Sequence, residues 1–129
     1  MVTKERFAQG MTLHEYVERM GANKERFTAA LARAAATPPD PGILERLGRP
    51  RKVLIITEDW CGTSLAYVPA VAALAASDPG IEVRVFLRDA NPDLMAQYLK
   101  RGLYRSIPVF AFFDAEMTEL ARFIEEAPA

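Results

Sequence analysis

The segment VLIIT at residues 53–57 constrains the fold of this chain more than any other stretch. Its apolar residues follow one another without polar interruption, and most of them are β-branched. This pattern is typical of a strand that is buried on both faces, as in the parallel part of a sheet. The segment therefore predicts an α/β protein whose sheet begins near residue 52.

The chain from residue 51 onward predicts the element order β-α-β-α-β-β. After the first strand, an alanine-rich helix is expected over 64–77, with Pro69 kinking it. The remaining elements are a strand over 81–89, a helix over 92–102 that ends at Gly102, and strands over 107–114 and 118–126.

The first 50 residues predict a helical extension packed on this core, so that residues 1–50 and 51–129 form one structural domain. Thr12 and Glu15 make a capping box for a short helix, and Asn23 is expected to cap a second helix over 24–36. The proline-rich segment 37–42 then breaks the chain. Asp40 and Pro41 suit the first positions of a helical turn over 43–47.

Composition narrows the classes of function. The 129 residues carry a net charge of -1 without a basic tract, which argues against nucleic acid as the main partner. No apolar run reaches the roughly 20 residues that span a bilayer, and the N-terminus lacks the apolar core of a signal peptide. We therefore expect a cytoplasmic protein without a membrane partner. A single cysteine excludes an internal disulfide, which fits a reducing compartment.

Four features of residues 51–126 resemble the thioredoxin-like superfamily. The motif WCGTS at 60–64 follows a buried strand and starts a helix, and Pro69 lies eight positions after Cys61. The segment DANP at 89–92 looks like the strand-to-helix turn of these proteins, and Ile107-Pro108 stands where they place a cis-proline. The phrase KVLIITEDWCG also resembles a bacterial subfamily with WCGxS motifs.

This resemblance implies a central mixed four-stranded sheet flanked by helices. It also implies that Cys61 is the catalytic thiol and that Ser64 assists it. The residues that it assigns to substrate positioning are Trp60, Gly62, Thr63, Ile107 and Pro108. No metal and no resident cofactor are implied, although an external thiol such as glutathione can take part.

Three departures from the thioredoxin pattern affect the mechanism. Ser64 replaces the second cysteine that normally releases the substrate, and Ile55 replaces a buried acid. No helix is expected after Ile124 to close the fold. Either the N-terminal helices or the second subunit of a homodimer is then expected to cover that face of the sheet.

The surroundings of Cys61 in the sequence have opposing effects on its reactivity. A helix N-terminus favours the thiolate over the thiol, and the Ser64 hydroxyl could donate a hydrogen bond to it. The acidic side chains of Glu58 and Asp59 would oppose ionisation if they lie close. A lone cysteine is also commonly a small buried apolar residue.

Two functions follow from these observations. The first is monothiol exchange or redox sensing, in which Cys61 forms a mixed disulfide with a protein or a small thiol. Such a thiol-disulfide oxidoreductase or thioltransferase would have low reductase activity of its own. The alternative is a non-catalytic module that binds peptides or proteins. Cluster assembly is disfavoured, since the residues after the third strand lack the glycine pair of monothiol glutaredoxins. His14 is the only histidine, so a zinc site is not expected.

Overall fold

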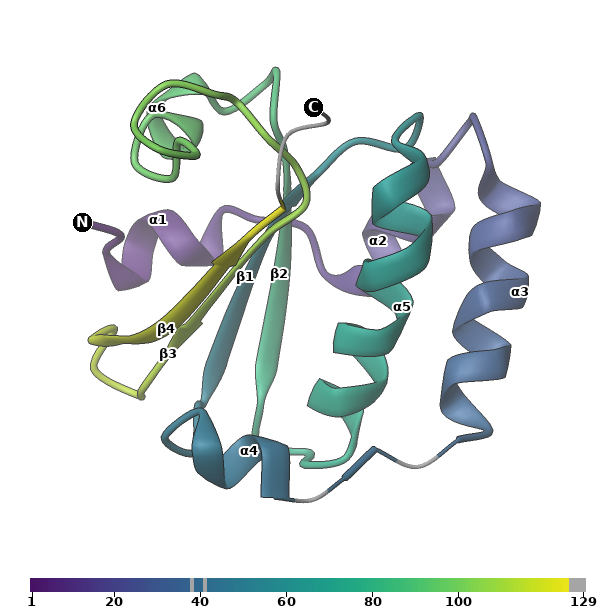
Figure 1. The fold of residues 1–129 in the computed structure, drawn as a ribbon, viewed down its shortest axis with the longest axis horizontal. Helices are drawn as coiled ribbons and strands as arrows, with labels where there is room; N and C mark the ends of the chain where they lie inside the picture. The colour runs from purple at the N-terminus through teal and green to yellow at the C-terminus, as the bar shows by residue number, and fades with distance from the viewer. Residues whose placement is uncertain (38, 41, 126–129) are drawn as a thin grey trace.

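The computed structural model describes residues 1–37, 39–40 and 42–125. Six helices and four strands occur among these residues (Figure 1). The helices are α1 (Lys4–Ala8), α2 (Leu13–Arg19), α3 (Lys24–Ala35), α4 (Gly42–Arg46), α5 (Gly62–Ala76) and α6 (Pro92–Met95). The strands are β1 (Lys52–Thr57), β2 (Glu82–Leu87), β3 (Val109–Phe113) and β4 (Glu119–Ile124).

The four strands form one mixed sheet in the order β2-β1-β3-β4. Strand β1 is parallel to β2, to which α5 connects it, and antiparallel to β3. Strand β4 pairs antiparallel with β3 and forms one edge of the sheet. The predicted β-α-β-α-β-β order and the α/β fold class are confirmed.

Strand β1 lies in the interior of the sheet and is buried on both faces, as its sequence predicts. Leu54 and Ile56 face the side of α1 and α6, where they pack with Phe7 and Leu94. Val53 and Ile55 face the side of α2 and α5; the other buried members of that core are Tyr16, Met20, Phe27, Val68, Val85, Phe110 and Phe112. Burying an aliphatic side chain contributes roughly 1.5–3 kcal/mol, so this strand anchors both layers.

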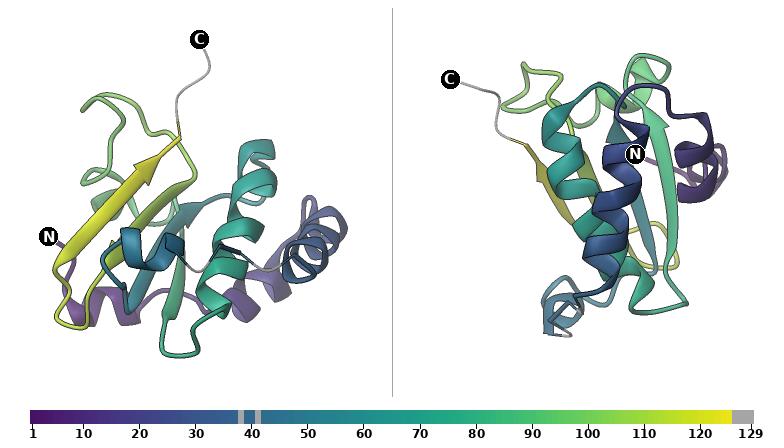
Figure 2. Two further views of the ribbon diagram at one scale, coloured as in Figure 1. Left: turned by 60° about the horizontal axis from the view of Figure 1, so that its bottom comes forward. Right: turned by 90° about the vertical axis from the view of Figure 1, so that its right-hand side faces the viewer.

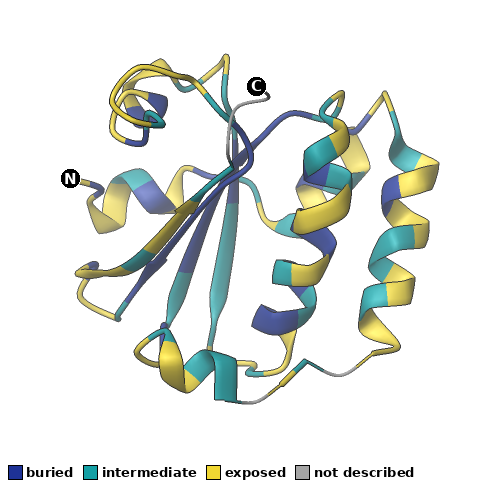
Figure 3. Cartoon of the chain, in the orientation of Figure 1, coloured by how far each residue is buried: buried dark blue, intermediate teal, exposed yellow. Residues whose placement is uncertain are grey.

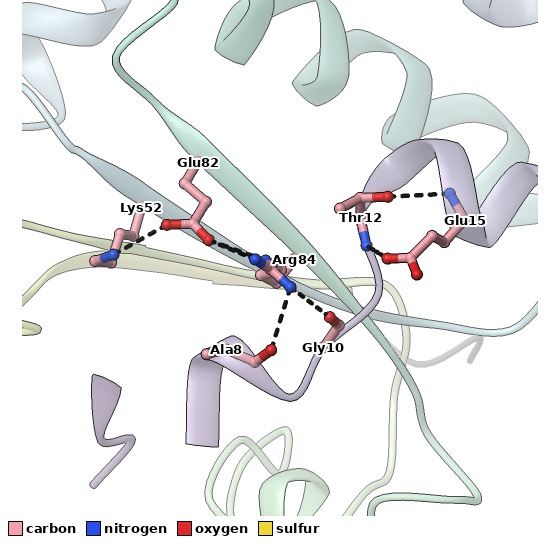
Figure 4. Close-up of polar contacts among 7 residues, drawn as sticks. All are labelled: Ala8, Gly10, Thr12, Glu15, Lys52, Glu82 and Arg84. Atoms are coloured by element: carbon pink, nitrogen blue, oxygen red, sulfur yellow. Dashed lines mark hydrogen bonds and ion pairs between the residues drawn. The ribbon is translucent and has the colours of Figure 1, made fainter. Parts of the chain in front are cut away.

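The N-terminal extension is fastened to β2 at several points. Arg84 on β2 donates to the carbonyls of Ala8 and Gly10, at 3.2 and 2.9 Å, and is held by Glu82 (Figure 4). Met11 makes an antiparallel bridge to Val85, with main-chain bonds of 2.9 and 2.7 Å. These contacts occupy the outer edge of β2 at Val85.

Helix α2 begins with the predicted capping box. The Thr12 hydroxyl accepts a bond from the amide of Glu15 at 3.1 Å, and the Glu15 carboxylate accepts one from the amide of Thr12 at 2.8 Å. The second predicted cap differs. Asn23 precedes α3 but has a left-handed backbone, and its side chain makes no capping bond. The side-chain amide of Asn23 instead donates to the main-chain carbonyl of Asp59 at 3.0 Å, so a tertiary contact replaces the cap.

Two elements differ from expectation. Helix α1 is not predicted by the sequence, although the Thr3 hydroxyl caps it. The helix expected over 92–102 ends at Met95, and the chain continues in turns that bury Tyr98. The expected helical turn and last strand appear as α4 and β4. Pro41 and Glu126, which belong to those predictions, lie outside the described residues.

The helices of the extension leave part of the β3–β4 face open. Helix α3 lies on the far side of α5 from the sheet, and α1 lies on the opposite face (Figures 1 and 2). Tyr67 on α5 and Phe123 on β4 contact each other, yet they remain 43% and 47% exposed. Helices α1 to α3 do not cover this face, and of the extension only the segment after α4 approaches it, where Leu47 packs on the same core as Ala121 and Gly48 lies next to Leu120. Cover by the extension is therefore partial, and cover by a second subunit stays a prediction.

Candidate functional site

Cys61 lies at the junction of β1 and α5, immediately before the first residue of the helix. It has an extended backbone, and its side chain makes no capping bond to the helix. The residue is partly buried, and its Sγ approaches the carbonyl oxygen of Ile107 at 3.9 Å. A sulfur at this distance from a carbonyl is a weak hydrogen-bond donor in its thiol form.

The segment before β3 brings a second part of the predicted site to Cys61. The Ile107-Pro108 peptide bond is cis, and both residues are buried. The carbonyl of Ile107 is directed at the Cys61 sulfur, whereas the carbonyl of Pro108 accepts a bond from the amide of Glu125 at 3.2 Å. Residues 46 positions apart in the sequence thus meet at the thiol.

Ser64 lies in the first turn of α5 and is buried at 2% exposure. The Thr57 hydroxyl, at the end of β1, donates to the Ser64 oxygen at 2.5 Å. Tyr16 on α2 also reaches Thr57. Burial raises the pKa of Tyr16 to about 12 and the charges of Asp59 and Glu58 act in the same direction, while its hydrogen bond with Thr57 opposes them. Three hydroxyl groups therefore cluster beneath the Cys61 turn.

The two acidic residues before Trp60 are engaged by main-chain amides. Asp59 accepts a bond from the amide of Gly21 at 3.0 Å, and Glu58 accepts one from the amide of Asp89 at 3.0 Å. With Tyr16 and Arg19 they line a small cavity of about 120 Å³ between α2 and the β1–α5 loop. Their carboxylates thus hold the loop to the turn after α2 and to the loop after β2.

Trp60 is 54% exposed and stands beside a cluster of charged side chains. The Arg88 guanidinium lies 5.1 Å from the centre of its ring. Arg88 also donates to the carbonyl of Arg105 at 3.1 Å and to Asp89 at 3.0 Å. Arg105 donates to the same Asp89 carboxylate at 3.0 Å, and hydrogen bonds from Arg88 and the charges of both arginines lower the pKa of Asp89.

The predicted site residues fall into one connected region. Gly62 and Thr63 form the start of α5, and a Cβ at Gly62 would meet no other atom within 4 Å, so that side is open. His14 lies elsewhere, exposed on α2, at 3.9 Å from Glu18. No group of three metal-binding side chains occurs among the described residues.

Sequence reasoning missed the supporting residues of the site, which are Tyr16, Thr57, Arg88 and Asp89. Thr57 could have been found as the polar end of an apolar strand. Asp89 opens the DANP segment, which the sequence marks only as a turn. Tyr16 and Arg88 come from segments whose proximity to Cys61 only the fold reveals.

The family model described as Thioredoxin matches residues 10–129. A crystal structure of a protein of unknown function from Pseudomonas aeruginosa gives a TM-score of 0.72 at 24% identity, covering 98% of this chain and 78% of that chain. An HIV epitope scaffold gives the same score and identity, with 97% and 78% covered. No curated protein matches significantly. Among the described residues, no helix has the length and apolar character to cross a membrane.

Proposed function

Because this chain belongs to the thioredoxin family, we propose that Cys61 is the nucleophile of a one-thiol exchange site. The observation that carries the proposal is the position of its sulfur. Cys61 directly precedes α5, is partly exposed, and approaches the carbonyl of Ile107 beside the cis peptide bond. A cysteine attacks a disulfide as its thiolate, and reactive cysteines of this kind commonly stand at helix N-termini.

Exchange begins when the Cys61 thiolate attacks one sulfur of a substrate disulfide. The Cys61–substrate bond forms while the substrate S–S bond breaks, and the other substrate sulfur leaves as a thiolate that takes a proton from water. The chain has no second cysteine, so an external thiol such as glutathione must attack the mixed disulfide. Its attack on the substrate sulfur forms a new disulfide and returns the Cys61 thiolate.

We assign the supporting roles to residues that surround the thiol in the fold. The Ser64 oxygen accepts a hydrogen bond from the Thr57 hydroxyl, which fixes Ser64 one turn after Cys61 and leaves its own hydroxyl proton free to donate. Its assigned role is to donate this proton in a hydrogen bond to the Cys61 thiolate. The residues assigned to substrate positioning are Trp60, Gly62, Thr63, Ile107 and Pro108. The substrates are proteins or small molecules with thiols or disulfides, in a reducing compartment such as the cytoplasm, where an external thiol is available.

The test is adduct formation with oxidised glutathione, followed by intact mass spectrometry. We expect one glutathionyl group per chain, which a second thiol removes, and no adduct on Cys61→Ser. If the folded protein gives no adduct while the same protein in denaturant does, the exchange proposal is wrong.

A binding module is the second candidate, and two residues favour it. Ile55, at the place of the acid in thioredoxins, is fully buried between Val85 and Phe110. Ser64, at the place of the releasing thiol, is engaged by Thr57. A folded protein whose thiol is inert, and whose Cys61→Ser variant binds peptide with unchanged affinity, would favour this function over exchange.

A further inference from the structure

Apolar side chains are exposed on the turn that follows α6. Leu103 is 73% exposed and Tyr104 is 49% exposed. Main-chain bonds hold this turn: the amide of Lys100 donates to the carbonyl of Tyr104 at 2.8 Å, and the amide of Tyr104 donates back at 3.0 Å. Figure 3 shows the loop after α6 as largely exposed. Contiguous exposed apolar surface marks interaction sites, so the surroundings of Leu103 decide whether this turn belongs to one.

A hollow of about 270 Å³ lies beside the turn. Its lining is apolar except for one arginine and consists of Pro92, Met95, Ala96, Leu99, Leu103 and Arg105. An open, mainly apolar hollow of this kind accommodates an aliphatic side chain. Free glutathione has no such side chain, because it carries carboxylates and amides around its cysteine.

The hollow is linked to the thiol site through Arg105, which lines the hollow and lies two positions before Ile107, whose carbonyl approaches the Cys61 sulfur. The carbonyl of Arg105 accepts a bond from Arg88, whose guanidinium lies against the Trp60 ring. Trp60 directly precedes Cys61, and both Cys61 and Leu99 pack on the same core. A polypeptide that reaches the Cys61 sulfur can therefore extend over Arg88 toward Leu103.

We propose that the hollow at Leu103 is a specificity subsite that holds an aliphatic side chain of an extended polypeptide whose cysteine reaches Cys61. Only the covalent step of this inference rests on the proposed exchange function. It assigns the preferred substrate to protein segments with an aliphatic residue near their cysteine.

The covalent test uses short peptides whose single cysteine carries thionitrobenzoate in a disulfide. Attack by Cys61 forms the Cys61–peptide disulfide and releases the coloured thiolate. Leucine or serine is placed at each position two to five residues on either side of the cysteine. We expect at least one leucine placement to react about tenfold faster than its serine counterpart.

The binding test uses the same peptides with serine in place of cysteine. Trp60 is the only tryptophan in the chain, so its fluorescence reports binding next to the thiol. The favoured leucine peptide should bind about tenfold more tightly than its serine counterpart. This measurement remains valid if Cys61 proves inert.

Leu103→Ser should abolish the leucine preference in both tests. The matched control is Leu120→Ser, which changes another exposed leucine, on β4, and should leave the preference intact. Equal rates and affinities for leucine and serine peptides, or a preference that survives in Leu103→Ser, would overturn the subsite. A dimer of the free protein that Leu103→Ser dissociates would also overturn it, because a second copy would then occupy the hollow.

The two proposals fail separately. Absence of reaction with oxidised glutathione, with the leucine preference in binding retained, rejects exchange and keeps the subsite. Reaction with oxidised glutathione without any leucine preference rejects the subsite and keeps exchange.

Discussion

The side-chain oxygens of Thr57 and Ser64 lie 2.5 Å apart and join the end of β1 to the first turn of α5. Both residues are buried, at 0% and 2% exposure. A buried hydroxyl pair stabilises the fold only while both partners are present. Ser64 is thus part of the structure that supports the Cys61 turn.

Ser64→Cys should restore the release step. A thiol at this position, one turn after Cys61, would attack the mixed disulfide within the same molecule. We expect the glutathione adduct to convert, without added thiol, to an internal disulfide between Cys61 and the introduced thiol, as read by intact mass. Ser64→Ala is the control and should keep its adduct. An adduct equally persistent in Ser64→Cys would show that position 64 cannot reach the sulfur.

Thr57→Val should destabilise the fold by about 1–3 kcal/mol, because it leaves the buried Ser64 oxygen without this donor. The measurement is the free energy of unfolding in urea. The control is the double variant Thr57→Val with Ser64→Ala, which removes both partners and should recover part of the loss. Additive losses in the double variant would mean that the two hydroxyl groups are not coupled.

Gly10→Ala should loosen the N-terminal extension. A Cβ at Gly10 would lie 2.6 Å from the Phe86 ring and 2.9 Å from the Cβ of Arg84, so β2 and the extension must separate. Overpacking of this kind typically costs about 1–3 kcal/mol. Gly62→Ala, where the added Cβ meets open space, is the matched control for urea unfolding. Equal stability of the two variants would contradict the close approach at Gly10.

Ionisation of Tyr16 should lower the free energy of unfolding in strong alkali. Its pKa is raised from 10.0 to about 12, chiefly by burial, so the folded chain keeps a proton that the unfolded chain loses. Its contribution is therefore complete below about pH 10 and is lost as the pH rises toward about 12. In urea unfolding, Tyr16→Phe should show a shallower decline of the free energy of unfolding across this window.

Tyr67→Phe is the matched control, because Tyr67 is partly exposed on α5. It should keep the decline of the unchanged protein. Burial raises the pKa of Tyr98 as well, so some decline should remain in Tyr16→Phe. A Tyr16→Phe curve that parallels the unchanged protein would mean that Tyr16 ionises equally in both states.

The sequence predicted the sheet because its strands are marked locally. The apolar run at 53–57 and the order of elements that follow identify the layers without long-range information. The predicted length of the helix that begins at Pro92 was wrong, because its end depends on the burial of Tyr98, which is a tertiary contact. The prediction that Asn23 caps the next helix was wrong for the same reason, because its side-chain amide donates to the carbonyl of Asp59.

For the candidate site, the sequence predicted only the residues that belong to recognisable motifs. The WCGTS motif and Ile107-Pro108 are visible as motifs, and the structure brings them together at the Cys61 sulfur. Tyr16 and Arg88 carry no motif, and they reach the site through the packing of α2 and the turn after β2. The roles of the site residues and the narrower bacterial subfamily stay predictions.

The Met11–Val85 bridge makes the two edges of the sheet differ in their capacity to pair with another strand. Main-chain bonds of Met11 occupy the edge at β2, whereas no strand among the described residues pairs with the outer edge of β4. An unpaired edge is a template for strand addition. Strand addition is therefore open along β4 and obstructed at the middle of β2, which favours pairing of two chains through β4 over growth into a fibre.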